Sequence, residues 1–478
     1  MTNEVIKSFA LPRRNLVIAA AGCGKTELIA RAVASFAERR QLILTHTHAG
    51  VRALRDRLKN VKADPKFYRV DTIAGLALRY ATSFPKISGC SVIEPKTEED
   101  YRNVYTSCLS AFNNSHIRDV ILKTYSGFYV DEYQDCTKRQ HSIIMLLAQF
   151  LPCRIVGDPL QGIFDFVKDD PLVDWNKDVF PHFSRLPDLT TPYRWIRKNE
   201  KLGAWLSKVR LSLLNGKMID LGSYRIPLCT NCNRIAKQLE TCKRLLAYKR
   251  DTIAVIRKWD KQAYSLGKNL RGLYSCMEEV ECRTLMKFCN KFDQSTPTQR
   301  PYIILTFVKE CVTSFPSVLK TLLKTYEEEK IPSSRITLKY PNLITAIEAL
   351  KKTKNFKPID RVLDEIISIQ DVKIYRRELY NELRKAVLNF DPNRDNSLSS
   401  SAWRSRESAR RVGRPISYRT VARTLLVKGL EFDHVIIPDI DDFDDAKNLY
   451  VALTRGSRSL KILSKEKLIT RPIPNFSC

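Results

Sequence analysis

A short turn of small residues, lying between an apolar run and a helix-like pattern, restricts the fold of this chain more than any other feature. Residues 16–20 predict a buried strand, residues 21–26 (AGCGKT) a tight turn, and residues 27–39 a helix with apolar faces. Small residues let backbone N–H groups surround a phosphate group, which the positive end of the next helix also attracts. The segment therefore predicts a phosphate-binding loop in an α/β domain.

The residues of this loop have separate expected roles toward a bound nucleotide. Lys25 is expected to neutralise the β- and γ-phosphate oxygens, and Thr26 to bind Mg²⁺. The loop residues expected to enclose the phosphates are Ala21, Gly22, Cys23, Gly24, Lys25 and Thr26. The first position of the usual pattern is Ala19 instead of glycine, so a chance match to a relaxed pattern is the alternative. ATP and Mg²⁺ are the predicted cofactors.

Two carboxylates directly follow a second apolar run. Residues 127–130 predict a strand, and Asp131 and Glu132 stand at its end. A site that hydrolyses a nucleotide needs one carboxylate to bind the metal and another to position or deprotonate water. We therefore expect Asp131 to bind Mg²⁺ and Glu132 to act as the base, with a solvated acidic turn as the alternative.

Polar and aromatic residues follow a third apolar run, which spans residues 153–156. Polar groups at the ends of parallel strands gather at one edge of a sheet, so Gln161 is expected to sense the γ-phosphate. Phe164 and Phe166 follow at alternate positions, where exposed aromatic side chains would stack on nucleic-acid bases. Packing in the core is the alternative for both rings.

The charge of the chain favours a polyanionic partner. The 478 residues carry a formal net charge of +29, which is typical of nucleic-acid binding, with a solvated basic surface as the alternative. At 44% hydrophobic and 28% charged residues, the composition is that of a globular chain and not of a disordered one. The length predicts roughly two to four domains.

Cysteine content and the lack of long apolar runs in the sequence indicate a compartment. Thirteen cysteines in so long a chain favour packed thiols in a reducing cytosol over a disulfide scaffold. Cys229 and Cys232 form a C-x-x-C pair followed by Cys242, but no second pair lies at zinc-finger spacing; a zinc site is the alternative. No apolar stretch approaches the roughly 18 residues that span a bilayer. We expect a cytoplasmic protein with no membrane partner.

Taken together, the motifs resemble those of the UvrD/Rep/PcrA group of superfamily 1 DNA helicases, in the family order. The matching segments are residues 19–26 (motif I), 45–48 (motif Ia), 71–75 (the next DNA-contacting motif), 131–135 (motif II), 157–164 (motif III), 190–195 (motif IV), 427–433 (motif V) and 449–455 (motif VI). The resemblance implies two RecA-like P-loop NTPase domains, with ATP in the cleft between them and single-stranded DNA across their top.

The resemblance also implies roles for residues of the later motifs. Arg194 and Arg455 would stabilise negative charge on the γ-phosphate during hydrolysis, with exposed salt bridges as the alternative. Tyr193 would stack on the nucleotide base, and Glu431 would contact the sugar or couple to DNA. The residues expected at DNA-contacting positions of these motifs are Thr45, His48, Thr72 and Phe166.

Several positions depart from the family pattern. The family usually has a glutamine before the P-loop that reads adenine, but none occurs before Lys25, and Glu27 stands where arginine is common. Both base-reading groups are therefore missing, and because a triphosphate clamp reads no base, the sequence does not predict which NTP or dNTP the site prefers. His46, His48 and Ala74 replace the usual DNA-contacting residues, so the path of the DNA is expected to differ.

The spacing of the motifs predicts a domain division with two insertions. The predicted segments are residues 1–82 and 116–188 (first RecA-like domain), 83–115 (reduced insertion), 189–275 and 416–478 (second RecA-like domain), and 276–415 (mainly helical insertion with a basic, arginine-rich end). The expected fold class is thus α/β, with parallel sheets flanked by helices and small, mostly helical insertions.

The densest basic stretch of the chain begins after residue 402. Trp403, Arg404 and Arg406 open a run of aromatic residues and arginines that suits a nucleic-acid backbone or a protein partner. A solvated, partly mobile loop is the alternative. Residues 393–401 before it predict a polar linker, and residues 439–445 predict an exposed acidic loop.

These expectations lead to an ATP-dependent helicase or translocase that moves on single-stranded or partly duplex DNA, 3′ to 5′ by the resemblance. The alternative is a DNA-stimulated NTPase that serves as a sensor or regulatory subunit for a partner nuclease, as in compact UvrD-like chains of anti-phage systems such as Gabija. A third possibility is a non-hydrolysing scaffold. The joint retention of six residues argues against it: Lys25, Asp131, Glu132, Gln161, Arg194 and Arg455.

Overall fold

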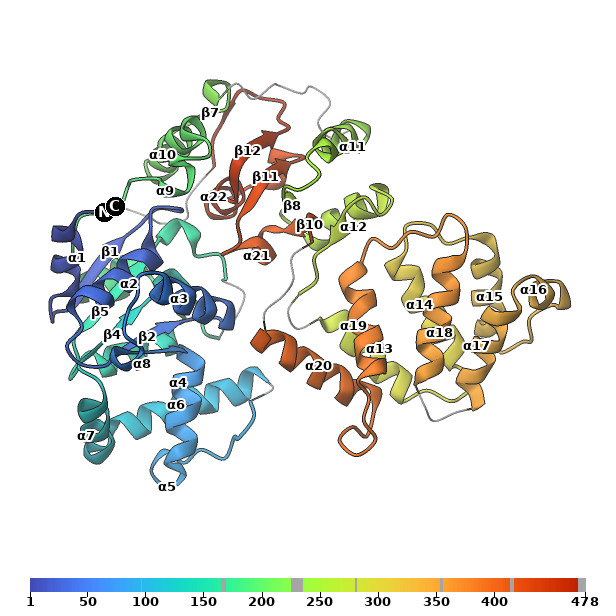
Figure 1. Cartoon of the computed structure of the whole chain (residues 1–478), viewed down its shortest axis with the longest axis horizontal. Coiled ribbons are helices and arrows are strands. Elements are labelled where there is room, and N and C mark those ends of the chain that lie inside the picture. Colours follow the sequence, from blue (N-terminus) through green and yellow to red (C-terminus); the bar gives the residue numbers. More distant parts are fainter. Residues whose placement is uncertain are drawn as a thin grey trace. The chain divides into compact units, whose positions relative to one another are not determined.

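The computed structural model describes two compact units. It covers residues 1–95, 97–164, 169–224, 235–279, 282–352, 356–412 and 417–471, except for the side chains of 408–412. Unit 1 contains Met1–Ile226, Phe443–Ser459 and Glu466–Cys478, and unit 2 contains Pro227–Asp442 and Leu460–Lys465. Figure 1 labels the elements of both units along the chain.

Unit 1 is built on a six-stranded sheet in the order β3-β2-β4-β5-β1-β6, and every pairing in it is parallel. Its central strands are buried along their whole length, which is why they appear in the sequence as continuous apolar runs. The strands are β1 (Asn15–Ile18), β2 (Gln41–Thr45), β3 (Tyr68–Thr72), β4 (Gly127–Val130), β5 (Cys153–Gly157) and β6 (Ser184–Arg185).

Helices cover both faces of this sheet, because successive side chains of a strand point to opposite faces. Leu16, Ile18 and Phe128 belong to one apolar core cluster, whereas Val17 and Tyr129 belong to another. The helices α4, α5, α6 and α7 form one group, in which α6 contacts the other three and also contacts α8 (Figure 1). The helices of unit 1 are α1 (Asn3–Ala10), α2 (Lys25–Phe36), α3 (His48–Asn60), α4 (Ile73–Ser83), α5 (Pro85–Ser88), α6 (Glu98–Asn113), α7 (Ser115–Thr124), α8 (Lys138–Leu147), α9 (Tyr193–Ile196), α10 (Glu200–Leu214) and α22 (Ala446–Leu453).

Unit 2 contains most of a second sheet, in the order β12-β11-β8-β10-β9. The pairings of β8 with β10, β9 with β10 and β8 with β11 are parallel. Of β12, the residues from Leu460 onward fall in unit 2. The elements of this part are α11 (Ile235–Arg244), β8 (Ile253–Arg257), α12 (Asp260–Asn269), β9 (Ser275–Cys276), β10 (Arg419–Arg423), α21 (Thr424–Val427), β11 (Phe432–Ile437) and β12 (Gly456–Ile462).

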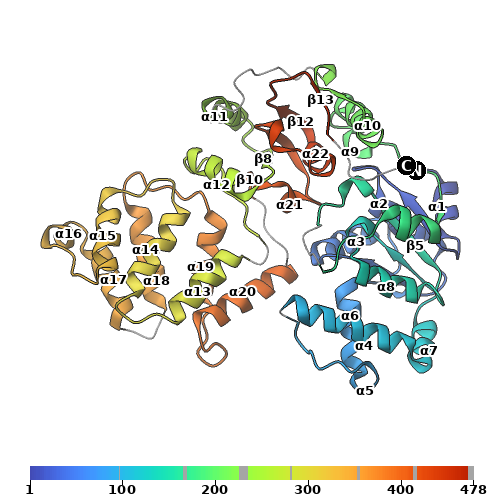
Figure 2. The same ribbon diagram turned by 180° about the vertical axis from the view of Figure 1, so that it is seen from behind.

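The rest of unit 2 is a helical bundle around its own apolar core (Figure 2). Residues 357–388 form two helices, because the helical conformation is interrupted between Ser368 and Arg377, where Ile374 forms an isolated bridge with Val312. The helices of the bundle are α13 (Arg283–Asp293), α14 (Arg300–Cys311), α15 (Ser317–Glu327), α16 (Ser334–Lys339), α17 (Pro341–Lys352), α18 (Lys357–Ser368), α19 (Arg377–Leu388) and α20 (Leu398–Val412).

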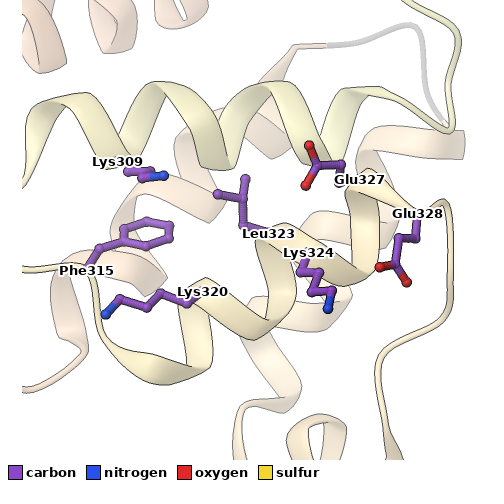
Figure 3. A pocket seen from close by; sticks show the side chains of 7 residues that line it. All are labelled: Lys309, Phe315, Lys320, Leu323, Lys324, Glu327 and Glu328. Atoms are coloured by element: carbon purple, nitrogen blue, oxygen red, sulfur yellow. The ribbon is translucent and has the colours of Figure 1, made fainter.

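One surface hollow of the bundle, of about 460 Å³, lies beside α14 and α15 (Figure 3). It is lined by Lys309, Phe315, Lys320, Leu323, Lys324, Glu327 and Glu328. Both signs of charge therefore border it. None of the described helices is both long and apolar enough to cross a membrane.

Two segments differ from the sequence-based expectation because their polar groups have partners inside the fold. The predicted linker 393–401 becomes helical at Leu398, where backbone N–H groups donate to the Asp293 carboxylate at 2.9 Å, and Ser401 is fully buried. The predicted exposed loop 439–445 is only partly exposed: Asp441 and Asp444 are exposed, whereas the side chain of Asp442 is 6% exposed and accepts a 3.1 Å hydrogen bond from Arg257. The hydrogen bonds to Asp293 and the ion pair with Arg257 satisfy polar groups that, in the sequence, indicated exposure to solvent.

Mostly parallel sheets flanked by helices, with mostly helical insertions, confirm the predicted α/β fold of two RecA-like domains. The compact units group residues differently from the predicted domain segments, because α9, α10 and α22 pack with unit 1. The predicted segments 189–275 and 416–478 are thus divided between the units, and that domain division stays a proposal.

Candidate nucleotide-hydrolysis site

The loop after β1 makes its turn with glycine at two left-handed positions, Gly22 (φ +71°) and Gly24 (φ +91°). Gly22 is needed for space as well, since a Cβ atom there would lie 2.8 Å from the Trp195 ring. Helix α2 begins directly after Gly24, at Lys25. Lys25 is buried and donates a 3.2 Å hydrogen bond to the carbonyl of Ala19. The loop thus has the conformation expected of a P-loop, and the Lys25 side chain extends back toward Ala19, which precedes the turn.

Substitution Gly22→Ala is expected to lower the free energy of unfolding by about 2–4 kcal/mol, because it combines a strained φ with a steric clash. Gly89 has a similar φ of +69°, but a Cβ atom there would have no heavy atom within 4 Å, so it serves as the matched control. Gly89→Ala should cost only the backbone strain, about 1–2 kcal/mol. Chemical denaturation of both variants checks this, and equal losses would mean that the Trp195 contact is unimportant.

Asp131 and Thr26 face each other at the end of β4. The Thr26 hydroxyl donates to the Asp131 carboxylate at 2.9 Å, and Asp131 also accepts from the backbone N–H of Glu132 at 2.9 Å. Burial, and then the negative charge of Glu132, raise the pKa of Asp131. A buried carboxylate with a raised pKa gains most from a nearby cation, so this position favours binding of a positive charge.

The chemistry of this pair fits Mg²⁺. The Thr26 hydroxyl and the Asp131 carboxylate are hard oxygen donors, and they lie beside the loop that would hold the phosphates. Among the described residues, no group of three or more His, Cys, Asp or Glu side chains could hold a metal ion. Mg²⁺ would therefore need phosphate oxygens and water to complete its shell, which is its usual mode of binding in nucleotide sites.

Glu132, the expected base, is held in an uncommon backbone conformation. Its φ of +54° lies in the left-handed region, which non-glycine residues seldom adopt. Its carboxylate accepts a hydrogen bond from the Gln134 amide and lies 4.0 Å from the Lys25 ammonium. Such strain at a turn persists only where surrounding contacts enforce it, and it is common at functional sites. The backbone and two partners thus fix the direction of the carboxylate.

The end of β5 continues this chain of contacts. Gln134 accepts a 2.8 Å hydrogen bond from the backbone N–H of Asp158, which is fully buried. The Asp158 carboxylate in turn accepts a 2.7 Å hydrogen bond from the side-chain amide of Gln161. Gln161 is itself only 4% exposed, so its amide is fixed by the protein before any nucleotide binds.

Both predicted arginines of the site lie in unit 1, close to the strand ends. Arg455, only 2% exposed, donates to the side-chain amide oxygen of Gln161 at 3.1 Å and to the backbone carbonyl of Val451 at 2.9 Å. Arg194 donates to the carbonyl of Thr454 at 2.6 Å. These contacts are possible because α22, far away in the sequence, packs against the turn after β5. Burial of Arg455 excludes the alternative of an exposed salt bridge for this residue.

The two remaining residues predicted to bind nucleotide have different surroundings. Tyr193 is 42% exposed, and its ring lies 3.6 Å from the position of a Cβ built on Gly24, next to the P-loop. Its hydroxyl accepts a hydrogen bond from the N-terminal ammonium group of Met1. Glu431 is an exposed residue of unit 2. Stacking on a base by Tyr193 and contact with the sugar by Glu431 stay predictions.

Some of the residues of unit 1 that are predicted to contact DNA are buried or form hydrogen bonds within the unit. Thr45 and Thr72 are buried, and Thr72 caps α4 by accepting from the Gly75 N–H at 2.9 Å. His48 is exposed at the first turn of α3, and Phe164 is partly buried. Phe166 lies outside the described residues. Of these positions, His48 has the exposure that contact with a nucleic acid requires.

Residues of the basic stretch in unit 2 also make hydrogen bonds and ion pairs within that unit. Arg404 donates to the Asp395 carboxylate at 3.1 Å. Arg406 is buried, donates to the carbonyl of Glu279 at 2.9 Å and lies 3.6 Å from the Glu382 carboxylate; Trp403 is half-buried. Contact of these three side chains with DNA stays a prediction, and it competes with partners inside the fold.

The cysteines behave as packed thiols wherever they are described. Each described cysteine is a free thiol, and all but Cys90 are buried. Burial raises the pKa of Cys242 to about 12 and that of Cys23, in the P-loop, to about 11. Both thiols are therefore neutral at physiological pH. Cys229 and Cys232 lie outside the described residues, so the C-x-x-C pair stays untested.

Four further residues belong to the site: Asp158, Trp195 and Tyr450 lie inside the matching motifs without an assigned role, and Arg210 lies outside all of them. Asp158 accepts from Arg210 of α10 at 2.6 Å, and the Tyr450 hydroxyl accepts from the backbone N–H of Ala21 at 3.2 Å. Trp195 donates to the carbonyl of Gly456 at 2.7 Å. Asp158 follows a strand directly, as Asp131 does, and that position is the one signal that could have identified it.

Comparisons with known proteins give one match to the first part of the chain and several structural similarities over most of its length. Residues 2–167 match a family model described as an AAA domain, and no curated protein matches the sequence. The chain is similar to the Pif1 helicase from Candida albicans (10% identity, TM-score 0.42, covering 98% of this chain and 95% of that one). It is also similar to the Pif1 helicase from Bacteroides in complex with ADP-AlF3 and ssDNA (12% identity, TM-score 0.40, covering 99% and 94%).

A further similar structure is arterivirus nonstructural protein 10, a helicase in complex with DNA (10% identity, TM-score 0.34, covering 96% of this chain). The present chain spans 63% of the length of that protein. The matched family model covers the P-loop, both carboxylates and Gln161. Residues 2–167 are therefore similar to an AAA domain, and the chain resembles superfamily 1 helicases in its motifs.

Proposed function

We propose that this protein is an NTP-driven motor that moves along single-stranded DNA in the 3′ to 5′ direction. The observation that carries the proposal is a continuous series of polar contacts in unit 1, from Lys25 to Arg455. The series runs through Lys25, Glu132, Gln134, Asp158, Gln161 and Arg455. It joins the P-loop to the base, the γ-phosphate sensor and an arginine from the end of the chain, which are the parts that phosphoryl transfer to water needs.

Each of these residues has a distinct task in hydrolysis. Glu132 accepts the proton of the attacking water, and its fixed turn directs the carboxylate toward one position. Lys25 and Arg455 stabilise the charge that develops on the phosphate oxygens, in a buried setting where such charges act strongly. When Mg²⁺ is bound at Thr26 and Asp131, it supplies further positive charge to those oxygens.

The support for DNA as the track comes from charge and from the motif resemblance. A formal net charge of +29 attracts a polyanion, and the matching motifs include two that contact DNA in the resembled family. Polarity rests on the resemblance alone. Because no glutamine precedes Lys25, we also propose that the site accepts GTP and dATP nearly as well as ATP.

Steady-state hydrolysis of ATP, GTP and dATP, with and without single-stranded DNA, tests this function. We expect turnover to rise by about tenfold or more with DNA, and the stimulation to fall steeply as salt increases. Blunt duplex DNA of the same length is the control, and it should stimulate less. Equal turnover with and without single-stranded DNA at low salt would contradict the proposal.

Movement is tested separately from hydrolysis. A streptavidin block at the 5′ end of an oligonucleotide should be displaced by a 3′ to 5′ motor, whereas a block at the 3′ end should remain. Displacement at the 3′ end alone would reverse the polarity. DNA-stimulated hydrolysis that displaces neither block would instead indicate the sensor or regulatory subunit for a partner nuclease.

A further inference from the structure

Arg210 lies at the centre of the site although no motif contains it. It projects from α10, its side chain is only 12% exposed, and it donates to the fully buried Asp158 at 2.6 Å. The two oxygens of Asp158 are thereby divided: Oδ1 accepts from Arg210 and Oδ2 accepts from Gln161. A carboxylate held on both oxygens cannot rotate, so Arg210 fixes the orientation in which Asp158 presents itself to Gln161.

A second contact joins Arg210 to the phosphate-binding loop. The Arg210 guanidinium group lies over the Tyr450 ring, with its central carbon 5.5 Å from the ring centre. The hydroxyl of Tyr450 accepts from the backbone N–H of Ala21 in the P-loop at 3.2 Å. Burial raises the pKa of Tyr450 to about 12, so this hydroxyl stays protonated at neutral pH. Arg210 therefore contacts both the residue that holds the sensor and the residue that holds the loop.

We propose that Arg210 is a positioning residue that couples the γ-phosphate sensor Gln161 to the P-loop, through Asp158 on one side and Tyr450 on the other. The inference rests on the proposed function, since it assigns Gln161 the task of recognising the γ-phosphate. A guanidinium group can make both contacts at once, because its N–H groups donate to a carboxylate while its flat face lies against an aromatic ring. A lysine ammonium is a single point charge and would keep the contact with one partner at a time.

Without Arg210, the buried Asp158 carboxylate loses the guanidinium group with which it forms an ion pair. Asp158 Oδ1 would then keep only the 3.2 Å hydrogen bond from the backbone N–H of Leu160, so the carboxylate, and with it the Gln161 amide, would be held less firmly where the γ-phosphate arrives. Discrimination between ATP and ADP should therefore suffer more than binding of the shared α- and β-phosphates, which the P-loop holds.

The test compares wild type with Arg210→Met, Arg210→Lys, Gln161→Ala and the double variant Arg210→Met with Gln161→Ala. Two quantities are measured for each: kcat with single-stranded DNA, and the ratio of the ATP and ADP dissociation constants by titration calorimetry. Arg210→Met should lower kcat by about 10- to 100-fold and bring the affinity ratio close to that of Gln161→Ala, with KM for ATP changed by less than about threefold. Arg210→Lys should retain part of the turnover.

The double variant shows whether the two residues act together or lower the turnover independently. Because both residues act through one unit, the double variant should be no worse than the poorer single variant, within about threefold. Multiplied losses would overturn the inference. Lys208→Ala, an exposed lysine on the same helix, is the matched control and should leave both quantities at wild-type values.

The outcomes also distinguish this inference from the proposed function. Wild type that binds neither nucleotide overturns both. Wild type with DNA-stimulated turnover, together with an Arg210→Met variant whose folded fraction keeps the wild-type kcat and affinity ratio, overturns the inference alone. If wild type binds ATP without hydrolysing it, the function as proposed is wrong, and the affinity ratio of Arg210→Met still decides whether Arg210 positions the sensor.

Discussion

Glu132→Gln is expected to lower DNA-stimulated turnover by about 10²- to 10⁴-fold while it leaves the dissociation constant for ATP within about threefold of wild type. Glutamine keeps the size of the side chain and an oxygen that accepts from the Gln134 amide. It cannot take a proton from water at neutral pH. Replacement also removes the negative charge that helps to raise the pKa of Asp131, so the carboxylate expected to bind Mg²⁺ becomes more readily ionised.

Turnover is measured at saturating ATP and DNA, and ATP binding by titration calorimetry. Glu38→Gln is the control, because Glu38 is an exposed carboxylate of the same unit that follows α2. Near-normal turnover of Glu132→Gln would mean that another group serves as the base. A large loss of ATP affinity would mean that Glu132 contributes to binding rather than to the chemical step.

Lys25→Ala is expected to reduce turnover at least about 10²-fold and to leave DNA binding largely intact. The lysine side chain is 8% exposed, and its ammonium group lies between the carbonyl of Ala19 and the carboxylate of Glu132. Alanine leaves the phosphates without their buried cation, and it leaves Glu132 without a neighbouring positive charge. Surface charges that attract DNA are not affected, so the two activities should separate.

Phosphate release and the fluorescence anisotropy of a labelled single strand, both at one fixed salt concentration, check this separation. Lys123→Ala removes an exposed lysine from α7 of the same unit and should change neither activity. Equal loss of hydrolysis and DNA binding in a Lys25→Ala protein that remains folded would show that one surface serves both, contrary to the expected division of tasks.

The parts of the site that sequence could predict are those defined by local pattern. The P-loop is a strand, a turn and a helix in succession, so the spacing from Leu16 to Lys25 already contains its geometry. Strand β4 is found at Gly127–Val130, as expected, because a strand buried on both faces must be apolar at every position. Asp131 and Glu132 follow from that strand, since parallel strands place their ends at one edge.

The parts that could not be predicted depend on contacts between distant segments. Arg210 has the appearance of an ordinary surface arginine on a helix until Asp158 is placed 2.6 Å away. Leu398 begins a helix within a serine-rich run because Asp293, remote in the chain, accepts from its N–H. Asp442 is acidic within an acidic run, yet its side chain is only 6% exposed because it pairs with Arg257. In each case a polar group has a hydrogen-bonding partner in a distant segment of the chain.

Gln161 and Arg455 hydrogen-bond across an interval of 294 residues. At roughly 5–20 residues per second, a ribosome needs on the order of 15–60 s to synthesise that interval. During this time the nascent chain already contains the P-loop and both carboxylates, but neither the arginine that contacts the sensor nor the tyrosine that holds the loop. Hydrolysis that depends on these two contacts is therefore expected only after the ribosome has passed Arg455, and a product that stops short of Tyr450 is expected to lack it.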